Sequence, residues 1–555
     1  MSGKQETNKP ESSPYAGRWV ARLRGKVIAQ GTTPEEARRA AQAQRHKEKV
    51  EIIYMPDPTK ETHPSLDKIL AAIPAQQEIY LVGGAVRDML MGRKAYDLDF
   101  AVPSNSIRLA RQIANALKAD FYPLDDERDT GRVILTNQDN TRTVMDFAAY
   151  RGASLEDDLR ARDFSINALA LDLRTQALTD PLNGAHDIQK KIIRACSETT
   201  FTDDPVRVLR AVRQAAQLGF QIDLTTRQYM KQAGAGLRSV SPERLRDELF
   251  RILEGPQPGT AIRALEMLGT LPHILPELPA LKGVKQPHPH VHDVWSHTLA
   301  VMNHLEGVLA ALAIGYDPES TGDLFTGLLS LKLGRYREQI AAHFANPLNA
   351  DRSPRALLFL AALYHDAAKP ACKMVDDTGR IRFWGHDEQG AEMIAWRGQA
   401  LHLSNHEIQR LRVVIKNHMR IHFHSNRLES EGKTPSRKAI YRFFRDAGEA
   451  SVELILLALA DTRATHGHEL RQETWSAVLN VGRIFLENYW EKPEETVSPP
   501  PLLNGHELMN ALALQPGPQV GELLEAIREA QATGRISTRA EALALAREKR
   551  SDQQT

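Results

Sequence analysis

The sequence predicts an α+β protein in which a mixed α/β domain is followed by helical domains. Strand patterns at residues 78–82, 98–102, 132–136 and 143–148 alternate with helical patterns such as the one at residues 106–118. Beyond Asp187 the pattern is almost wholly helical to the C-terminus. The chain has 555 residues, of which 42% are hydrophobic, and this is enough for several domains with separate cores.

Shifts in composition predict five segments along the chain. Residues 1–60 form a small basic ββαβ-like module, whose helix begins after Thr33 and Pro34. Residues 17–49 carry nine Arg or Lys against three Glu, which indicates either an RNA-contacting patch or an ordinary solvated face. The remaining segments are an α/β head at 61–187, a helical neck at 188–285, a histidine-rich helical domain at 286–496 and a helical tail at 497–555.

Composition excludes several classes of protein. The net charge is only +1, so any nucleic-acid-binding surface must be local. Cys196 and Cys372 lie far apart without ligand spacing, which favours a reducing compartment. The first 14 residues are polar, unlike a signal peptide, and no run of 18 apolar residues offers a membrane span. We therefore expect a cytoplasmic protein with no membrane partner.

The segment at residues 81–88 (LVGGAVRD) joins an apolar strand to a short helix through Gly83 and Gly84. Glycines at such a turn let backbone N–H groups approach phosphate oxygens without a Cβ in the way. Arg87 adds a guanidinium that pairs with the same kind of anion. A glycine pair alone is usually only a turn, so this segment needs support from its neighbours.

Carboxylates on the next strands supply that support. Asp97 and Asp99 are two residues apart, so both side chains point to one face, about 7 Å apart at 3.3 Å per residue. Two such carboxylates can hold a pair of divalent ions about 3.5–4 Å apart. Asp146 offers a third carboxylate on another strand. Together with the glycines, this predicts a site for a metal-bound nucleoside triphosphate.

Two further clusters carry arginine beside acidic or amide side chains. In the first, Arg162, Asp163 and Asn167 suit a turn that binds phosphate and sugar hydroxyls, although a salt-bridged helix start is the alternative. In the second, Asp204 and Arg207 recur at a three-residue step, which places them on one helical face. A carboxylate and a guanidinium together can read a base edge by its hydrogen-bond pattern. Arg210 and Arg213 continue this face; the alternative is a salt-bridged surface helix.

These motifs resemble the class II tRNA nucleotidyltransferase and bacterial poly(A) polymerase family in order and spacing from Ile79 to Glu254. The resemblance implies a polymerase-β-like head followed by an all-α neck. It implies that Asp97 and Asp99 are catalytic and bind Mg²⁺. The nucleotide-binding residues that it implies are Gly83, Gly84, Arg87, Arg162, Asp163, Asn167, Asp204, Arg207, Arg210 and Arg213.

Thirteen of the twenty histidines lie between Gln286 and His424. The pair His365-Asp366 ends an apolar helix, and this order resembles the HD phosphohydrolase domain. The resemblance implies His297, His365, Asp366 and Asp461 as metal ligands, with His386 and His418 as candidates for a second ion. Such mixed ligands suit Mn, Fe, Co, Ni or Zn. The histidines expected at the surface or in linkers are His288, His290, His402, His406, His422 and His424.

The predicted function is template-independent addition of CCA, or part of it, to tRNA 3′ ends from CTP and ATP with Mg²⁺. An HD phosphohydrolase activity accompanies it; the alternative is an inactive HD-shaped domain that holds RNA. A poly(A) polymerase or an A-only adding enzyme shares every motif, and a flexible loop, expected at residues 124–132, bears on this choice. An alternative from another class is an HD nucleotide phosphohydrolase with a vestigial RNA-binding head.

Overall fold

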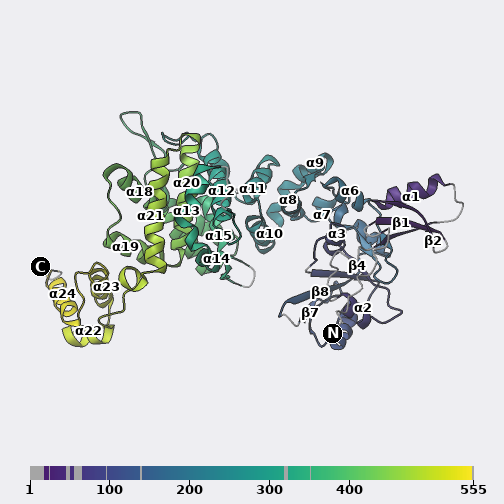
Figure 1. The fold of residues 1–555 in the computed structure, drawn as a ribbon, viewed down its shortest axis with the longest axis horizontal. Helices are drawn as coiled ribbons and strands as arrows, with labels where there is room; N and C mark the ends of the chain where they lie inside the picture. Colours follow the sequence, from purple (N-terminus) through teal and green to yellow (C-terminus); the bar gives the residue numbers. More distant parts are fainter. Residues whose placement is uncertain are drawn as a thin grey trace, which may run out of the picture. The chain divides into compact units, whose positions relative to one another are not determined.

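The computed structural model describes residues 15, 18–23, 26–44, 50–55, 66–95, 97–137, 140–317, 323–349 and 352–552. The chain divides into two compact units, Met1–Gly236 and Leu237–Thr555 (Figure 1). The division falls within the segment predicted as the neck. The finer division into five segments stays a prediction.

A seven-stranded mixed sheet lies at the centre of the first unit, with strand order β10-β9-β4-β5-β8-β7-β6. Neighbouring strands are antiparallel except β5 and β8, which are parallel. The strands are β4 (Tyr80–Val82), β5 (Asp97–Val102), β6 (Asp120–Asp125), β7 (Thr130–Thr136), β8 (Arg142–Ala149), β9 (Ala170–Leu171) and β10 (Leu178–Thr179). The four predicted strands are therefore confirmed as β4, β5, β7 and β8, while β6, β9 and β10 were not predicted.

Helices cover this sheet and continue beyond it within the first unit. Helix α4 (Ser106–Leu117) packs its buried residues Leu109 and Ile113 into the same core as Phe100 and Phe147 of the sheet. A short parallel pair, β11 (Ile192–Ile193) and β12 (Gln221–Ile222), interrupts the helical region that was predicted after Asp187. The helices are α2 (Leu66–Ala72), α3 (Gly84–Leu90), α4 (Ser106–Leu117), α5 (Leu155–Arg160), η1 (Ser165–Asn167), α6 (Gly184–Lys190), α7 (Thr200–Asp203), α8 (Arg207–Leu218) and α9 (Leu224–Ala233).

A small three-stranded sheet precedes the head in the same unit. It consists of β1 (Arg18–Leu23), β2 (Lys26–Gly31) and β3 (Glu51–Met55), with α1 (Pro34–Ala43) between β2 and β3, which confirms the predicted order of strands and helix. Thr33 caps α1, because its Oγ1 accepts the N–H of Glu36 at 3.1 Å. Trp19 and Ala37 pack against Leu90 and Leu178 of the head. The RNA-contacting role of this module stays a prediction.

The second unit is almost wholly helical, as predicted. Helix α12 (Val294–Ala311) packs along α15 (Pro354–Tyr364) and α20 (Ser451–His466). One short hairpin of β13 (Met374–Val375) and β14 (Ile381–Arg382) departs from this pattern. The α-helices are α10 (Pro242–Glu254), α11 (Pro258–Met267), α12 (Val294–Ala311), α13 (Leu324–Leu333), α14 (Arg337–Ala345), α15 (Pro354–Tyr364), α16 (His386–Ala400), α17 (Asn405–Asn417), α18 (Met419–Glu431), α19 (Arg437–Ala447), α20 (Ser451–His466), α21 (Gln472–Trp490), α22 (Gly505–Leu512), α23 (Pro518–Ala532) and α24 (Arg539–Asp552). Short 3₁₀ or π turns are η2 (Gly234–Ser239), η3 (Leu271–His273), η4 (Leu278–Leu281), η6 (Gly334–Tyr336), η7 (Gly448–Ala450), η8 (Gly467–Glu469) and η9 (Pro493–Val497).

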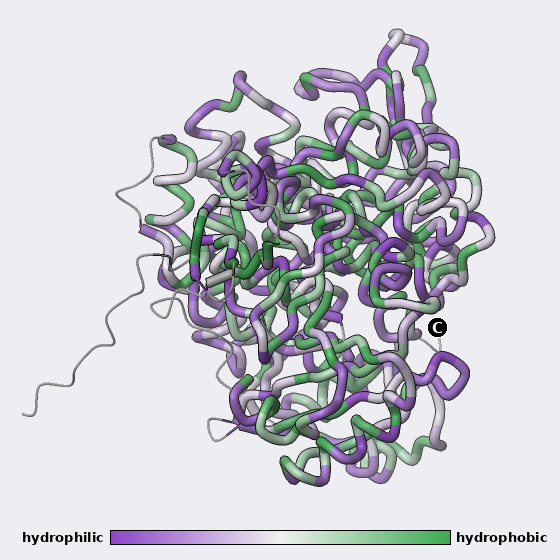
Figure 2. Tube along the Cα trace, turned by 90° about the vertical axis from the view of Figure 1, so that its right-hand side faces the viewer, coloured by the Kyte–Doolittle hydropathy of each residue, from purple (hydrophilic) through white to green (hydrophobic). Residues whose placement is uncertain are grey.

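Hydrophobic and hydrophilic stretches alternate along the traces of many helices, as one-sided burial requires (Figure 2). Helices α22, α23 and α24 form their own small core around Leu508, Leu523 and Ile527. Among the described residues, no helix combines the length and the apolarity that crossing a membrane requires.

A fully buried carboxylate joins two segments of the helical unit. Glu407, which is 0% exposed, accepts Arg352 Nε on Oε1 at 2.5 Å and Arg352 Nη2 on Oε2 at 3.0 Å. Its Oε2 also accepts the N–H of Ser404, which completes a capping box at the start of α17. Burial opposes ionisation, but these donors outweigh it and lower the pKa of Glu407.

Replacing Arg352 with alanine is expected to lower the free energy of unfolding by about 3–5 kcal/mol, because it leaves a buried charge unpaired. The loss is measured by urea unfolding above pH 5. It should shrink as the pH falls, because the stabilisation from a carboxyl with a lowered pKa is lost with protonation. Arg412→Ala is the matched control, since Arg412 lies on the same helix as Glu407 but is 40% exposed in its pair with Glu392. A loss of equal size in both variants would contradict the argument from burial.

Candidate active site and candidate metal centre

Three aspartates lie on one face of the central sheet. Asp97 and Asp99 are two residues apart on β5, and Asp146 on β8 is the register partner of Asp99. Register partners point to the same face of a sheet, at a strand spacing of about 4.7–4.9 Å. The next pair, Phe100 and Phe147, therefore points to the opposite face, where the rings stack 4.9 Å apart in the core. Burial of this aromatic pair fixes the register that brings the carboxylates together.

The three carboxylates form a concentrated negative site. Burial raises the pKa of Asp99, and the charges of Asp146 and Asp97 raise it further, against the opposing effect of Arg162 and Arg210. Like charges gathered on one face are stabilised by a cation, and oxygen ligands suit Mg²⁺. The residues therefore fit the divalent ions that the motif implies.

Gly83 lies at the turn between β4 and α3, beside this cluster. Its φ is +73°, a conformation that side chains disfavour. A Cβ at this position would lie 3.0 Å from Nη1 of Arg162 and 3.6 Å from Oδ2 of Asp99. The N–H of Gly83 donates to the carbonyl of Leu169 at 3.1 Å, which anchors the turn to the start of the neighbouring strand β9. Gly83 thus lets Arg162 and Asp99 approach the turn closely, and Gly84 starts α3.

Replacing Gly83 with alanine is expected to lower nucleotide addition about 100-fold, because displacing a positioned group by about 1 Å costs this much. The added strain should also cost about 1–2 kcal/mol of stability. Gly219→Ala is the matched control, because Gly219 has a φ of +70° but no atom within 4 Å of an added Cβ. Single-turnover rates and thermal unfolding separate the two effects; equal activity in both variants would contradict the role of the close approach.

Arg162 is held in place by a buried carboxylate. Its Nε and Nη2 donate to Oδ2 of Asp158 at 3.1 and 2.9 Å, and the Asp158 side chain is only 4% exposed. The other oxygen of Asp158 accepts the N–H of Arg151 at 3.2 Å. This arrangement directs Nη1 of Arg162 toward Gly83. The sequence interpretation did not assign Asp158 a role, although its spacing of four residues from Arg162 is typical of a helical ion pair.

A buried polar network joins α3, η1 and α8. Arg87 Nη1 donates to Oδ1 of Asn167 at 2.9 Å, and Asn167 Nδ2 donates to Asp163 at 2.9 Å and to Gln214 at 3.1 Å. Arg210 Nη2 lies 3.1 Å from Oδ2 of Asp163. Burial alone would raise the pKa of Asp163, but Arg210 and the Asn167 amide hold it low. Asp163 and Asn167 therefore form a buried frame that orients the two arginines.

The predicted base-reading pair lies where α8 begins. Arg207 is the first residue of α8, and its Nε lies 3.9 Å from Oδ2 of Asp204. Its Nη1 and Nη2 donate to the carbonyls of Thr200 and Ala161 at 3.3 and 3.2 Å. Contact with a base would exchange some of these bonds. Arg213 lies six residues further along α8, where it donates to Gln217 at 3.1 Å.

The segment predicted as a flexible loop at residues 124–132 is instead a β-hairpin between β6 and β7, so that prediction is wrong. Asp129 ties the hairpin to α4, because its carboxylate accepts the N–H groups of Ser106 and Ile107 at 2.8 and 3.0 Å. A capped helix terminus restrains this turn.

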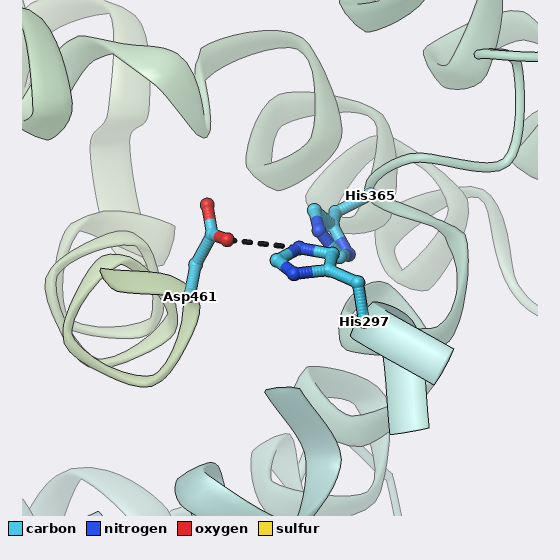
Figure 3. Close-up of side chains that lie close together, drawn as sticks. All are labelled: His297, His365 and Asp461. Carbon is cyan, nitrogen blue, oxygen red and sulfur yellow. Dashed lines mark ion pairs between the residues drawn. The ribbon is translucent and has the colours of Figure 1, made fainter. Parts of the chain in front are cut away.

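In the second unit, three helical segments bring together His297, His365 and Asp461 (Figure 3). His297 lies on α12, His365 follows α15, and Asp461 lies on α20. Nε2 of His297 lies 3.0 Å from Oδ1 of Asp461. All three side chains are buried, and their ligand atoms lie within 4.8 Å of one another. This is a compact group of metal-ligating side chains.

Asp366 connects this group to a second one. Its Oδ2 lies 3.6 Å from Nε2 of His297 and 3.2 Å from Nε2 of His365. Its Oδ1 lies 3.5 Å from Nε2 of His386 and 3.9 Å from Nε2 of His418. The two sides of one carboxylate therefore face the two predicted ligand sets.

The imidazoles are oriented as metal ligands require. His365, His386 and His418 each place Nδ1 against a backbone carbonyl, at 2.8, 2.7 and 2.6 Å, so that Nε2 faces the centre. Burial lowers the pKa of His418 to about 3, which keeps it neutral. Among the described residues, Nε2 of His365 is buried without a hydrogen bond of good geometry, although Oδ2 of Asp366 lies 3.2 Å away. A buried ring nitrogen beside carboxylate oxygens fits a divalent cation at this centre.

Three further side chains lie close to this centre. His422 was expected at the surface, but its Nε2 lies 2.8 Å from Oδ2 of Asp461, so that prediction is wrong. His290 is also half-buried, with its ring 5.2 Å from that of His297. Lys369 Nζ lies 2.7 Å from Oδ2 of Asp366. The i,i+4 spacing from His418 to His422 was the signal that could have identified His422.

Four known protein families match successive parts of the chain. Residues 79–194 match the poly A polymerase head domain, and residues 219–281 match a family described as "Probable RNA and SrmB- binding site of polymerase A". Residues 294–465 match the HD domain, and residues 496–546 match tRNA nucleotidyltransferase domain 2.

Similar proteins cover most of the chain. It is 33% identical over 477 residues to an A-adding tRNA nucleotidyltransferase of Deinococcus radiodurans, covering 84% of this chain and 94% of that protein. It is 32% identical over 476 residues to a CC-adding tRNA nucleotidyltransferase of Thermus thermophilus, covering 84% and 93%. A structure of a CCA-adding enzyme with ATP shares the fold at a TM-score of 0.56 and 22% identity, covering 86% of this chain and 94% of that one. The predicted α+β fold class is confirmed.

Proposed function

Because the chain belongs to the tRNA nucleotidyltransferase family, we propose that it adds nucleotides of the CCA sequence to tRNA 3′ ends, using CTP and ATP. The family predicted from the motifs is confirmed. The observation that carries the proposal is the row of carboxylates formed by Asp97, Asp99 and Asp146 beside Gly83 and Arg162. An alternative in which the head is vestigial does not account for this assembled site.

Each group of site residues has a distinct role in the proposed reaction. Asp97 and Asp99 would hold two Mg²⁺, and the chemistry supplied there would be polarisation of the attacking ribose hydroxyl and neutralisation of charge on the triphosphate. Arg162, fixed by Asp158, would bind the triphosphate, and Arg87 would orient it from α3. Asp204 and Arg207, at the start of α8, would select the base by its hydrogen-bond pattern. With tRNA as the substrate, the location that we propose for the protein is the cytoplasm.

Incorporation of labelled CTP and ATP tests the proposal, using tRNAs that end before the first C, after CC and after the complete CCA. We expect incorporation on at least one of the incomplete ends and none on the complete end. Ordered addition of C, C and A identifies a complete CCA enzyme, while A alone or the two C residues alone identify a partial one. An unlimited A tail would identify a poly(A) polymerase. No incorporation with Mg²⁺ would overturn the proposal.

The HD centre supports a second activity, a metal-dependent phosphohydrolase. Its ligands would be His297, His365, Asp366 and Asp461 for one ion, with His386 and His418 completing a second site through Asp366. Mn, Fe, Co, Ni or Zn suit these ligands and would activate water for hydrolysis of a phosphate ester. Hydrolysis of 2′,3′-cyclic or 3′-phosphate RNA ends, with each metal added in turn, tests it. If the domain binds metal but hydrolyses none of these ends, the alternative of an inactive domain that holds RNA would be favoured.

A further inference from the structure

The third carboxylate of the head is already occupied by an arginine. Arg132 on β7 is the register partner of Asp146, which is itself the register partner of Asp99. Arg132 Nε donates to Oδ1 of Asp146 and Nη2 donates to Oδ2, both at 2.8 Å. This is a bidentate pair in which each carboxylate oxygen accepts a charged donor.

Arg132 also interacts electrostatically with the whole cluster of carboxylates. Asp97, Asp99 and Asp146 share one face, and the guanidinium of Arg132, which never loses its proton, stands at the end of this row. The hydrogen bonds that Arg132 donates to Asp146, together with the charges of Asp146, Asp97 and Asp99, raise the pKa of Arg132. A divalent ion that binds Asp146 must therefore displace an ionic hydrogen-bond pair of good geometry.

We propose that Arg132 is a positioning residue that withholds Asp146 from divalent cations in the nucleotide-free enzyme. Asp97 and Asp99 then hold the metal alone until the triphosphate adds its own oxygens. The guanidinium also orients Asp146 beside Asp99, because the fork fixes the plane of the carboxylate. This inference rests on the proposed nucleotidyltransferase function of the head.

Binding of Mn²⁺ to the full-length, nucleotide-free protein tests the inference, with free Mn²⁺ followed by electron paramagnetic resonance. The head sites are defined as those lost in Asp97→Asn. Arg132→Gln is expected to tighten these sites about tenfold, the effect of removing a charge-assisted competitor worth about 1.4 kcal/mol or more. Arg128→Gln is the matched control on the same hairpin. Arg128 is 82% exposed, and this substitution removes the same positive charge as Arg132→Gln.

A second variant distinguishes release of Asp146 as a metal ligand from the general electrostatic effect of losing the positive charge of Arg132. In Arg132→Gln combined with Asp146→Asn, the tenfold gain should disappear, whereas a pure charge effect would retain it. Unchanged or weaker Mn²⁺ binding in Arg132→Gln, with an unchanged unfolding temperature, would overturn the inference. If Arg132→Gln does not fold, Arg132→Lys, which keeps the charge but loses the fork, should still tighten binding, and no gain would overturn it. Full Mn²⁺ binding in Asp97→Asn would instead contradict the proposed function of the head.

Discussion

Replacing Asp99 with asparagine is expected to lower the rate of nucleotide addition by about 10³-fold or more, because metal-ion stabilisation of the transition state is worth several kcal/mol. Asp99 stands between Asp97 on its own strand and Asp146 on the next, so its charge is central to any ion held by this face. Asparagine keeps the shape of the side chain and removes only the charge. Single-turnover incorporation of labelled ATP and CTP measures the loss.

Stability should change in the opposite direction in this variant. The pKa of Asp99 is raised by burial and by the neighbouring carboxylates, so its charged form destabilises the folded state at neutral pH. Asp99→Asn should therefore unfold at the same or a higher temperature than the parent protein. Asp120→Asn, on the exposed edge strand β6, is the matched control and should leave addition within about twofold. Retained nucleotide addition in Asp99→Asn would show that this face of the sheet is not the catalytic site.

The head was predictable from sequence to the extent that its chemistry lies within short segments. Asp97 and Asp99 share a face because of strand geometry alone, and their distance along the chain is fixed. The pairing of Asp99 with Asp146, and of Asp146 with Arg132, depends on the register of three strands. That register follows from burial of Phe100 and its neighbours, which no local pattern specifies. Sequence therefore indicated the third carboxylate but not the arginine that occupies it.

Errors in the sequence interpretation have similar causes. Residues 124–132 are polar and were assigned to a flexible loop, whereas strand pairing and the cap from Asp129 to α4 order the hairpin. His422 was placed at the surface because dipeptides and clustering give no information on helix packing. Its contact with Asp461 exists because α18 and α20 pack together. Long-range helix packing, not residue type, decides which histidines enter the centre.

Replacing Asp366 with asparagine is expected to lower the phosphohydrolase rate about 10³-fold or more and to reduce bound transition metal at both ligand groups. The reason is that both oxygens are used: Oδ2 faces His297 and His365, and Oδ1 faces His386 and His418. An amide supplies one neutral oxygen and cannot bridge two cations in the same way. Metal content, measured by mass spectrometry after dialysis, and hydrolysis of a 2′,3′-cyclic nucleotide give independent readouts.

Asp387→Asn is the matched control for this experiment, because Asp387 belongs to another His-Asp dipeptide, with His386, but to neither ligand group. It should retain metal and hydrolysis, and both variants should retain nucleotide addition, since the head belongs to the other compact unit. Parallel loss of addition in Asp366→Asn would show that the two activities depend on each other. Metal retained in full by Asp366→Asn would mean that the histidines and Asp461 suffice, and the bridging role of Asp366 would be contradicted.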